Sequence, residues 1–122
     1  MKTNKIIYWT LTGLVTLVFL GSSSGKLMGN AEALKMAEGF GFNAENYRTI
    51  GVVELISVLL FLWPRTGILG TLLLSAYMGG AIATHVQHAQ PLMAPCIVLT
   101  FVLAVSFYRF PELRQKLLNQ QD

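Results

Sequence analysis

Polar residues embedded in apolar sequence are the first candidates for chemistry in this chain. Glu54 lies inside a long apolar run, where an ionised carboxylate that faces lipid costs several kcal/mol. We therefore expect Glu54 to face other helices and to contact a cation. Lys26, at the end of the preceding apolar run, is the expected partner, whereas Arg48 lies at a similar level but points to a different side. A purely structural pair is the alternative, because burying an ion pair seldom stabilises a protein by itself.

A second set of residues shares one face of a later apolar segment, by the spacing of three and four: Tyr77, Ala81, Thr84, His85 and His88. The two histidines are possible metal ligands, but a zinc site needs a third or fourth ligand and only Glu54 is at hand. We instead expect His85 to contact Glu54 or Tyr77 and to titrate.

These polar groups together predict a small-molecule pocket with apolar walls that opens toward the outer leaflet. Its expected residues are Lys26, Arg48, Glu54, Tyr77 and His85. A quinone or a lipid head group is the kind of amphipathic ligand that such a pocket suits, and no metal is expected in it. A phosphate loop at GSSSGKLMG (residues 21–29) is excluded, because the spacing, the missing hydroxyl residue after Lys26 and the preceding apolar helix all differ from G-x-x-x-x-G-K-[ST].

The composition indicates a membrane protein. The chain has 122 residues, of which 53% are hydrophobic and 12% charged, about half the charged share of an ordinary soluble domain. Its length suits one domain, residues 1–122. The net charge of +3 comes without a basic stripe interleaved with aromatics, so nucleic acid is not an expected partner and the lipid bilayer is.

Four apolar segments predict an all-α fold, an integral membrane bundle of four transmembrane helices at about residues 6–24, 44–63, 66–84 and 91–108. Each is about 18–20 residues long, which is what a helix needs to cross the hydrocarbon layer. A cleaved signal peptide is the alternative for the first segment, given Lys2, Lys5 and the small residues Ser22 and Ser24.

Lysines and arginines predict the orientation in the bacterial inner membrane. Six lie on the side shared by the two termini and the turn after Trp63, and both termini should therefore be cytoplasmic. Aromatic residues expected at the same boundary are Tyr8, Trp9, Trp63 and Tyr108. A short helix from Asn30 to Gly39 should lie at the outer interface or cover the bundle, and a second should follow Pro111 in the cytoplasmic tail, residues 111–122.

Small residues recur every four positions in the third segment: Ser75, Gly79 and Ala83, and in parallel Ala76, Gly80 and Thr84. Such rows favour close helix packing, and the alternative is that they leave room for a flat ligand beside Tyr77. The one cysteine, Cys96, excludes dithiol chemistry within a single copy and is expected to be buried as a small hydrophobe.

The chain resembles the DoxX-like family of small bacterial membrane proteins over nearly its whole length. The resemblance rests on three stretches in order: GSSSGKL after a helix that begins YWTLTG, then RTIGVVELISVLLFLWPRTGILG, then LLLSAYMGGAIATHVQH. It implies a four-helix membrane bundle, with the recurrent polar residues of the family at Lys26, Glu54, Tyr77 and His85. Relatives are associated with quinone-linked sulfur oxidation, thiol and oxidative-stress complexes, and channel assembly.

The expected function is an inner-membrane accessory protein whose outward-facing pocket binds quinone or a similar ligand and supports a redox or oxidative-stress partner. An enzyme acting alone is not expected, because no complete catalytic set is present. One alternative is an assembly or chaperone module with a structural Glu54–Lys26 pair, and a homo-oligomer is compatible with either. A small transporter is disfavoured, because four helices would have to oligomerise to form a pathway.

Overall fold

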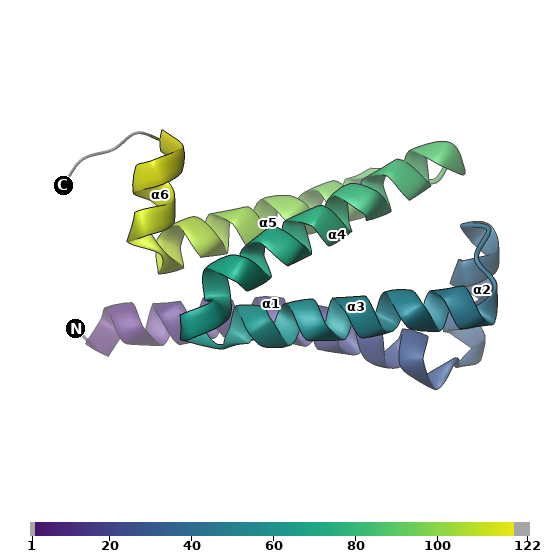
Figure 1. Ribbon diagram of the computed structural model, residues 1–122, viewed down its shortest axis with the longest axis horizontal. Coiled ribbons are helices and arrows are strands. Elements are labelled where there is room, and N and C mark those ends of the chain that lie inside the picture. Colours follow the sequence, from purple (N-terminus) through teal and green to yellow (C-terminus); the bar gives the residue numbers. More distant parts are fainter. Residues whose placement is uncertain (1, 119–122) are drawn as a thin grey trace.

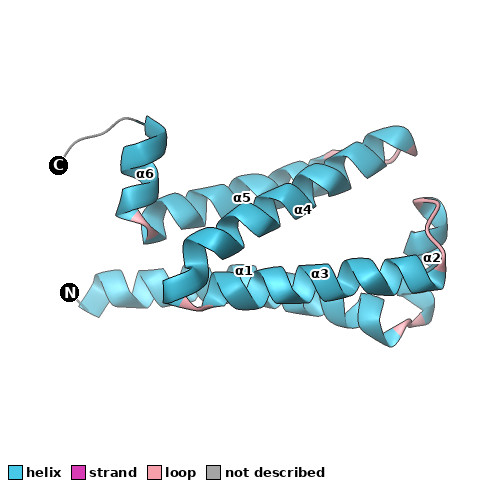
Figure 2. Cartoon of the chain, viewed as in Figure 1, coloured by secondary structure: helices cyan, strands magenta, loops and turns pink. Residues whose placement is uncertain are grey.

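The computed structural model describes residues 2–118, with side chains from Asn4 onward, and this part of the chain is helical throughout, without a strand. Short loops join the helices (Figure 2). Expectations that concern the side chain of Lys2 or residues 119–122 lie outside the described residues. The elements are α1 (Lys2–Met28), α2 (Ala31–Gly39), α3 (Ala44–Leu62), the 3₁₀ turn η1 (Pro64–Thr66), α4 (Gly67–Gln87), α5 (Met93–Arg109) and α6 (Pro111–Leu118).

The helix boundaries follow from capping residues. Asn30 and Asn43 have extended backbones, and their side chains accept hydrogen bonds from the amides of Ala33 and Asn46, which confirms the expected cap of α2 at Asn30. Helix α1 extends past the expected end at residue 24 and continues through the serines to Met28. It ends there because Gly29 adopts a positive φ of 64°. Pro64 follows Trp63, the C-cap of α3, and starts the turn into α4.

Four helices form two antiparallel pairs, α1 with α3 and α4 with α5. The pairs lie close together near the start of the chain and diverge toward α2 (Figure 1). The contact between α3 and α4 is extensive, whereas α1 and α5 contact each other less. The buried core between the pairs consists of Val15, Phe19, Val58, Phe61, Leu74, Met78, Val102 and Val105.

The end of the bundle nearest the start of the chain is tightly packed, and we call it the closed end; it comprises Tyr8, Phe61, Gly70, Arg109 and Phe110. A side chain at Gly70 would overlap the backbone of Phe61, so α3 and α4 meet at backbone distance there. Arg109 is 4% exposed and donates a hydrogen bond from Nη1 to the carbonyl of Phe61 at 2.8 Å. Its guanidinium also lies 5.1 Å from the ring centroid of Tyr8 and 4.7 Å from that of Phe110.

Within residues 2–118, two helical stretches are long and apolar enough to cross a membrane: Asn4–Met28, in α1, and Pro64–Gln87, which is η1 with α4. The number rises to three if α5 and α6, which meet at 108°, are taken as one bent span. Helix α3 has 19 residues but contains Glu45, Arg48 and Glu54, and α5 alone has 17. Apolar side chains cover the exterior of the bundle, among them Leu17, Ile56, Leu72 and Ile97. A membrane protein is the class of protein that these features fit.

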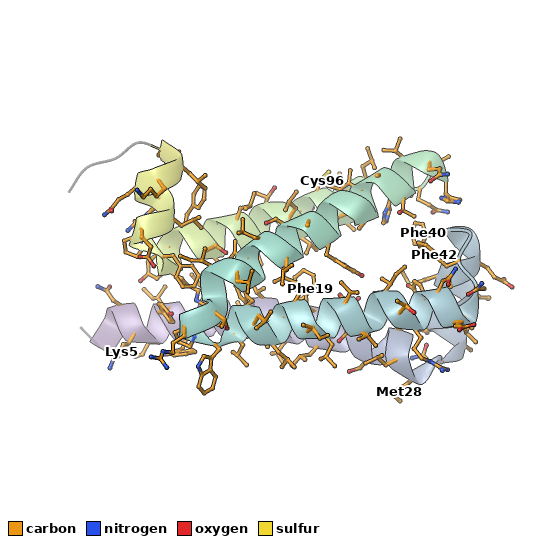
Figure 3. The ribbon with its side chains drawn as sticks, viewed as in Figure 1. Lys5, Phe19, Met28, Phe40, Phe42 and Cys96 are labelled. Atoms are coloured by element: carbon orange, nitrogen blue, oxygen red, sulfur yellow. The ribbon has the colours of Figure 1, made fainter. Side chains whose placement is uncertain are left out.

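Cys96 corrects one expectation, because its side chain is exposed rather than buried. It lies on the outer face of α5, beside Ile97, which is 59% exposed, and Figure 3 shows it pointing away from the bundle. A small apolar side chain suits a lipid-facing surface as well as a core, so the apolar run that contains Cys96 does not distinguish the two positions.

Candidate functional site

A cavity of about 440 Å³ lies between the two helix pairs, on the side toward α2. All four bundle helices and α2 contribute to its lining, most of which is apolar. Phe19 projects into the space between the pairs, while Phe40 and Phe42 lie at the end of the molecule where the pairs diverge (Figure 3). We call this part of the molecule the open end. The volume of the cavity falls within the range of ordinary small-molecule pockets.

Glu54 is the centre of a polar cluster in this cavity, which we define as Ser22, Lys26, Glu54 and Tyr77. Its side chain is 1% exposed, and one oxygen, Oε1, accepts three hydrogen bonds. The donors are Lys26 Nζ at 3.0 Å, Tyr77 Oη at 3.2 Å and Ser22 Oγ at 3.3 Å. The expected contact between Glu54 and Lys26 is therefore confirmed, and Tyr77 also donates a hydrogen bond to Glu54.

Ser22 and Tyr47 are members of the cavity that the sequence analysis did not select. Ser22 precedes Lys26 by one helical turn and accepts a hydrogen bond of 2.6 Å from its ammonium. The ring of Tyr47 lies 5.4 Å from Lys26 Nζ and that of Tyr77 lies 5.9 Å away. The ammonium is thus held by one carboxylate, one hydroxyl and two aromatic faces.

Gly51 explains how α1 and α3 come close enough for the ion pair. A Cβ at this position would lie 2.8 Å from Cβ of Lys26 and 3.4 Å from the carbonyl oxygen of Ser23. Gly51 precedes Glu54 by three residues, so the two lie on neighbouring parts of one helix face. The spacing G-x-x-E within an apolar helix was the signal in the sequence that could have indicated this close approach.

His85 lines the cavity, but its contacts differ from the expected ones. Its Nδ1 lies 2.6 Å from the carbonyl oxygen of Ala81, on its own helix, and its ring packs 4.5 Å from that of Phe40. The expected hydrogen bond to Glu54 or Tyr77 was therefore wrong, because the ring turns back along α4 and toward the α2 end. Within residues 2–118 no three potential metal ligands come together.

Arg48 and His88 lie outside the cavity. Arg48 is exposed and does not belong to the residues that line it, because it faces a different side of α3 from Glu54. His88 follows α4, bonds the carbonyl of Thr84 at 3.0 Å and lies against Gly41. Of the five expected pocket residues, the structure places Lys26, Glu54, Tyr77 and His85 on the cavity.

The small residues of α4 leave space instead of packing closely. A Cβ at Gly79 or Gly80 would meet no atom within 4 Å, so the expected tight helix contact is absent at these positions within the described chain. Ala76, Gly80 and Thr84 line the cavity. The alternative interpretation of this row, room for a ligand beside Tyr77, is the one that agrees with the geometry.

The electrostatics of the polar cluster are those of a neutral pair. One carboxylate and one ammonium oppose each other at 3.0 Å, and the remaining groups are neutral hydroxyls. Removing one partner of such a pair strands a buried charge, which costs about 3–5 kcal/mol in proteins. The cluster can therefore hold a polar head group by hydrogen bonds without itself carrying a net charge.

Comparison with known proteins gives one match. The pattern of the DoxX-like family fits residues 10–107, which is most of the chain and includes the whole polar cluster. Comparisons with curated proteins and with solved structures give no match.

Proposed function

Since the chain belongs to the DoxX-like family, we propose that it is an integral membrane accessory protein that binds an amphipathic ligand such as a quinone in the cavity beside Glu54. In this proposal the protein supports a redox or oxidative-stress partner and is not an enzyme by itself. The observation that carries the proposal is a buried carboxylate with three donors on one oxygen, beside a largely apolar cavity of about 440 Å³. Few convergent polar groups in an apolar cavity are the usual features of a small-molecule site.

The proposed topology is four membrane crossings in the bacterial inner membrane, with both termini in the cytoplasm. Its support is that the start of α1, the α3–α4 turn and the end of α5 lie together, as the contacts of Arg109 with Tyr8 and Phe61 require. The lysines and arginines concentrated there correspond to the positive-inside rule. The cavity and α2 then face the outer side, where α2 covers the ends of α1 and α3.

Reporter fusions test this topology. A reporter fused after Asn43 should report the outer side, and one fused at the C-terminus should report the cytoplasm. Two fusions that report the same side would contradict four crossings.

Quinone binding is tested by exchanging the charges of the central pair. The double substitution Lys26→Glu and Glu54→Lys keeps one acid and one base in contact but moves the carboxylate to α1. We expect the purified double variant in nanodiscs to keep its helical content while its affinity for the reduced, quinol form of a short-chain ubiquinone falls about tenfold or more, as expected when a hydrogen bond to a charged group is lost. Arg48→Gln, at an exposed position outside the cavity, is the matched control and should bind like the wild type.

A normal affinity in the exchanged variant would overturn the ligand proposal and leave a structural ion pair. That result would favour the second candidate function, a membrane-protein assembly module. One observation supports this candidate: Gly79 lies outside the cavity lining on an exposed part of α4, and a Cβ added there would meet no atom of the described chain within 4 Å beyond its own helix. A small residue on an uncovered, apolar helix face is a typical contact point for another transmembrane helix.

A further inference from the structure

We infer that the cavity selects a neutral ligand whose head group donates a hydrogen bond, namely a hydroxyl on an aromatic ring such as a phenol or quinol. This inference rests on the proposed function and specifies the ligand class of the same cavity. It follows from which hydrogen-bonding atoms of the cavity lining are already used and which remain.

The carboxylate of Glu54 offers one unused oxygen. All three hydrogen bonds go to Oε1, and within the described chain Oε2 accepts none. Glu54 is part of the cavity lining, so Oε2 is the carboxylate oxygen that a ligand there can use. A carboxylate oxygen accepts hydrogen bonds and cannot donate them.

Most donors beside Glu54 are, in contrast, already engaged. Tyr77 and Ser22 each have one hydroxyl hydrogen, which points to Oε1. Lys26 uses two of its three N–H donors, on Ser22 and Glu54. Two neutralised or weak donors remain within the described lining, the third N–H of Lys26 and the hydroxyl of Tyr47. A hydroxyl head group, which both donates and accepts, can pair with them and with Oε2, whereas a group that only accepts leaves the carboxylate oxygen unpaired.

His85 adds a second acceptor nearer the α2 end. Its Nδ1 lies 2.6 Å from the carbonyl oxygen of Ala81, and a carbonyl can only accept, so Nδ1 carries the hydrogen. In the neutral imidazole Nε2 is then an acceptor. The hydroxyl of Thr84 already donates to the carbonyl of Gly80 at 2.9 Å and adds no free donor.

Charge and shape narrow the ligand class further. Lys26 is the one lysine or arginine among the lining residues, and Glu54 neutralises it, so an anionic head group gains no net attraction and meets a carboxylate. Aromatic side chains contribute from three sides, with Phe19 and Tyr77 edge to face at 6.4 Å and Phe40 beside His85. Rings arranged in this way favour another aromatic ring over an aliphatic chain.

A matched pair of probes tests the inference: 1-naphthol, which donates a hydrogen bond, and 1-methoxynaphthalene, which only accepts. Equilibrium binding is measured on the full chain in nanodiscs, with empty nanodiscs to subtract partitioning into lipid. We expect wild-type protein to bind naphthol about 10- to 100-fold more tightly, the range expected for a hydrogen bond to a charged group.

Glu54→Gln should reverse this preference. The three donors hold an amide oxygen in the place of Oε1, and the amide NH₂ then takes the place of Oε2 and donates into the cavity. The variant should therefore bind the methoxy probe at least as tightly as naphthol. Cys96→Ala, on the outer face, is the control and should retain the wild-type preference.

The outcomes separate this inference from the proposed function. Equal affinities in the wild type, tighter binding of the methoxy probe, or a preference for naphthol that survives in Glu54→Gln would overturn the inference while the pocket stands. Binding of neither probe above the lipid background would overturn the proposed function itself. If Glu54→Gln does not fold, as judged by circular dichroism and gel filtration, the comparison of the two probes on the wild-type protein still decides.

Discussion

Both ends of the bundle bury a charged side chain, and they stabilise it in different ways. At the open end Glu54 meets an opposite charge, Lys26, within a polar cluster. At the closed end Arg109 hydrogen-bonds the carbonyl of Phe61 at 2.8 Å and, more weakly, that of Leu62 at 3.5 Å. These carbonyls are free because α3 ends there and Pro64 follows, and a cation at the C-terminal end of a helix is favoured by the helix dipole.

The packing around the glycines of α4 also differs between the two ends. Gly67 and Gly70 at the closed end lie against Phe110 and Phe61, where a side chain would overlap its neighbour. At the open end the space beside Gly79 and Gly80 is empty within the described chain. The comparison shows that one helix serves as a packed support at its start and as a cavity wall at its end. We conclude that substitutions of the α4 glycines should affect mainly stability at the closed end and mainly binding at the open end.

The largest effect on stability is nevertheless expected at the open end, from Lys26→Met. This change leaves Glu54 buried without its cation and should lower the free energy of unfolding by about 3–5 kcal/mol. The double variant Lys26→Met with Glu54→Gln removes both charges and should recover most of the loss. Denaturant titration in detergent micelles measures the free energy of unfolding of both variants. If Lys26→Met alone is as stable as wild type, the role assigned to the ion pair is contradicted.

A smaller loss, about 1–3 kcal/mol, is expected from Gly70→Ala, because the new methyl group overlaps the backbone of Phe61. Gly79→Ala is the matched control on the same helix, and its free energy of unfolding should stay within about 0.5 kcal/mol of wild type or rise slightly. Thermal unfolding followed by circular dichroism compares the two. Equal effects at both positions would remove the packing difference between the two ends.

The smallest of the three effects is expected from Arg109→Met. It strands no opposite charge and leaves only the carbonyls of Phe61 and Leu62 without a donor, so the loss should be about 1–2 kcal/mol, below that of Lys26→Met. Ligand affinity should not change, because the cavity lies at the other end. The same micelle titration, with naphthol binding as a second readout, tests this. A loss larger than that of Lys26→Met would show that the closed end carries the more costly charge.

The sequence allowed the helices to be predicted from the lengths of the apolar runs. The central ion pair could be predicted because a carboxylate deep in an apolar run needs a partner and few cations were available. Arg109 was not predicted to be buried, because a basic residue at the end of an apolar run equally suits a solvated head group at a membrane boundary. Its partners are backbone carbonyls, which every residue possesses, so no residue type indicates them. The four crossings remain a prediction, since two helical stretches, or three with the bent pair, satisfy the length and composition of a span.

Tyr47 and the orientation of His85 depended on how α2 and the loop after it pack against α3 and α4, which local patterns do not determine. Arg48 was placed in the pocket by its depth alone, and the direction in which it faces on α3 removed it. The cavity itself arises from the divergence of two helix pairs. No spacing of residues within one helix encodes that angle.

The short turn η1 between α3 and α4 fixes the direction in which α4 leaves the closed end. Helix α4 has 21 residues, so at 1.5 Å per residue its far end lies about 30 Å from this turn. A difference of about 5° in the direction of α4 would displace that far end by nearly 3 Å, roughly the diameter of a water molecule. The geometry of the three residues of the turn therefore bears on the width of the cavity beside Glu54.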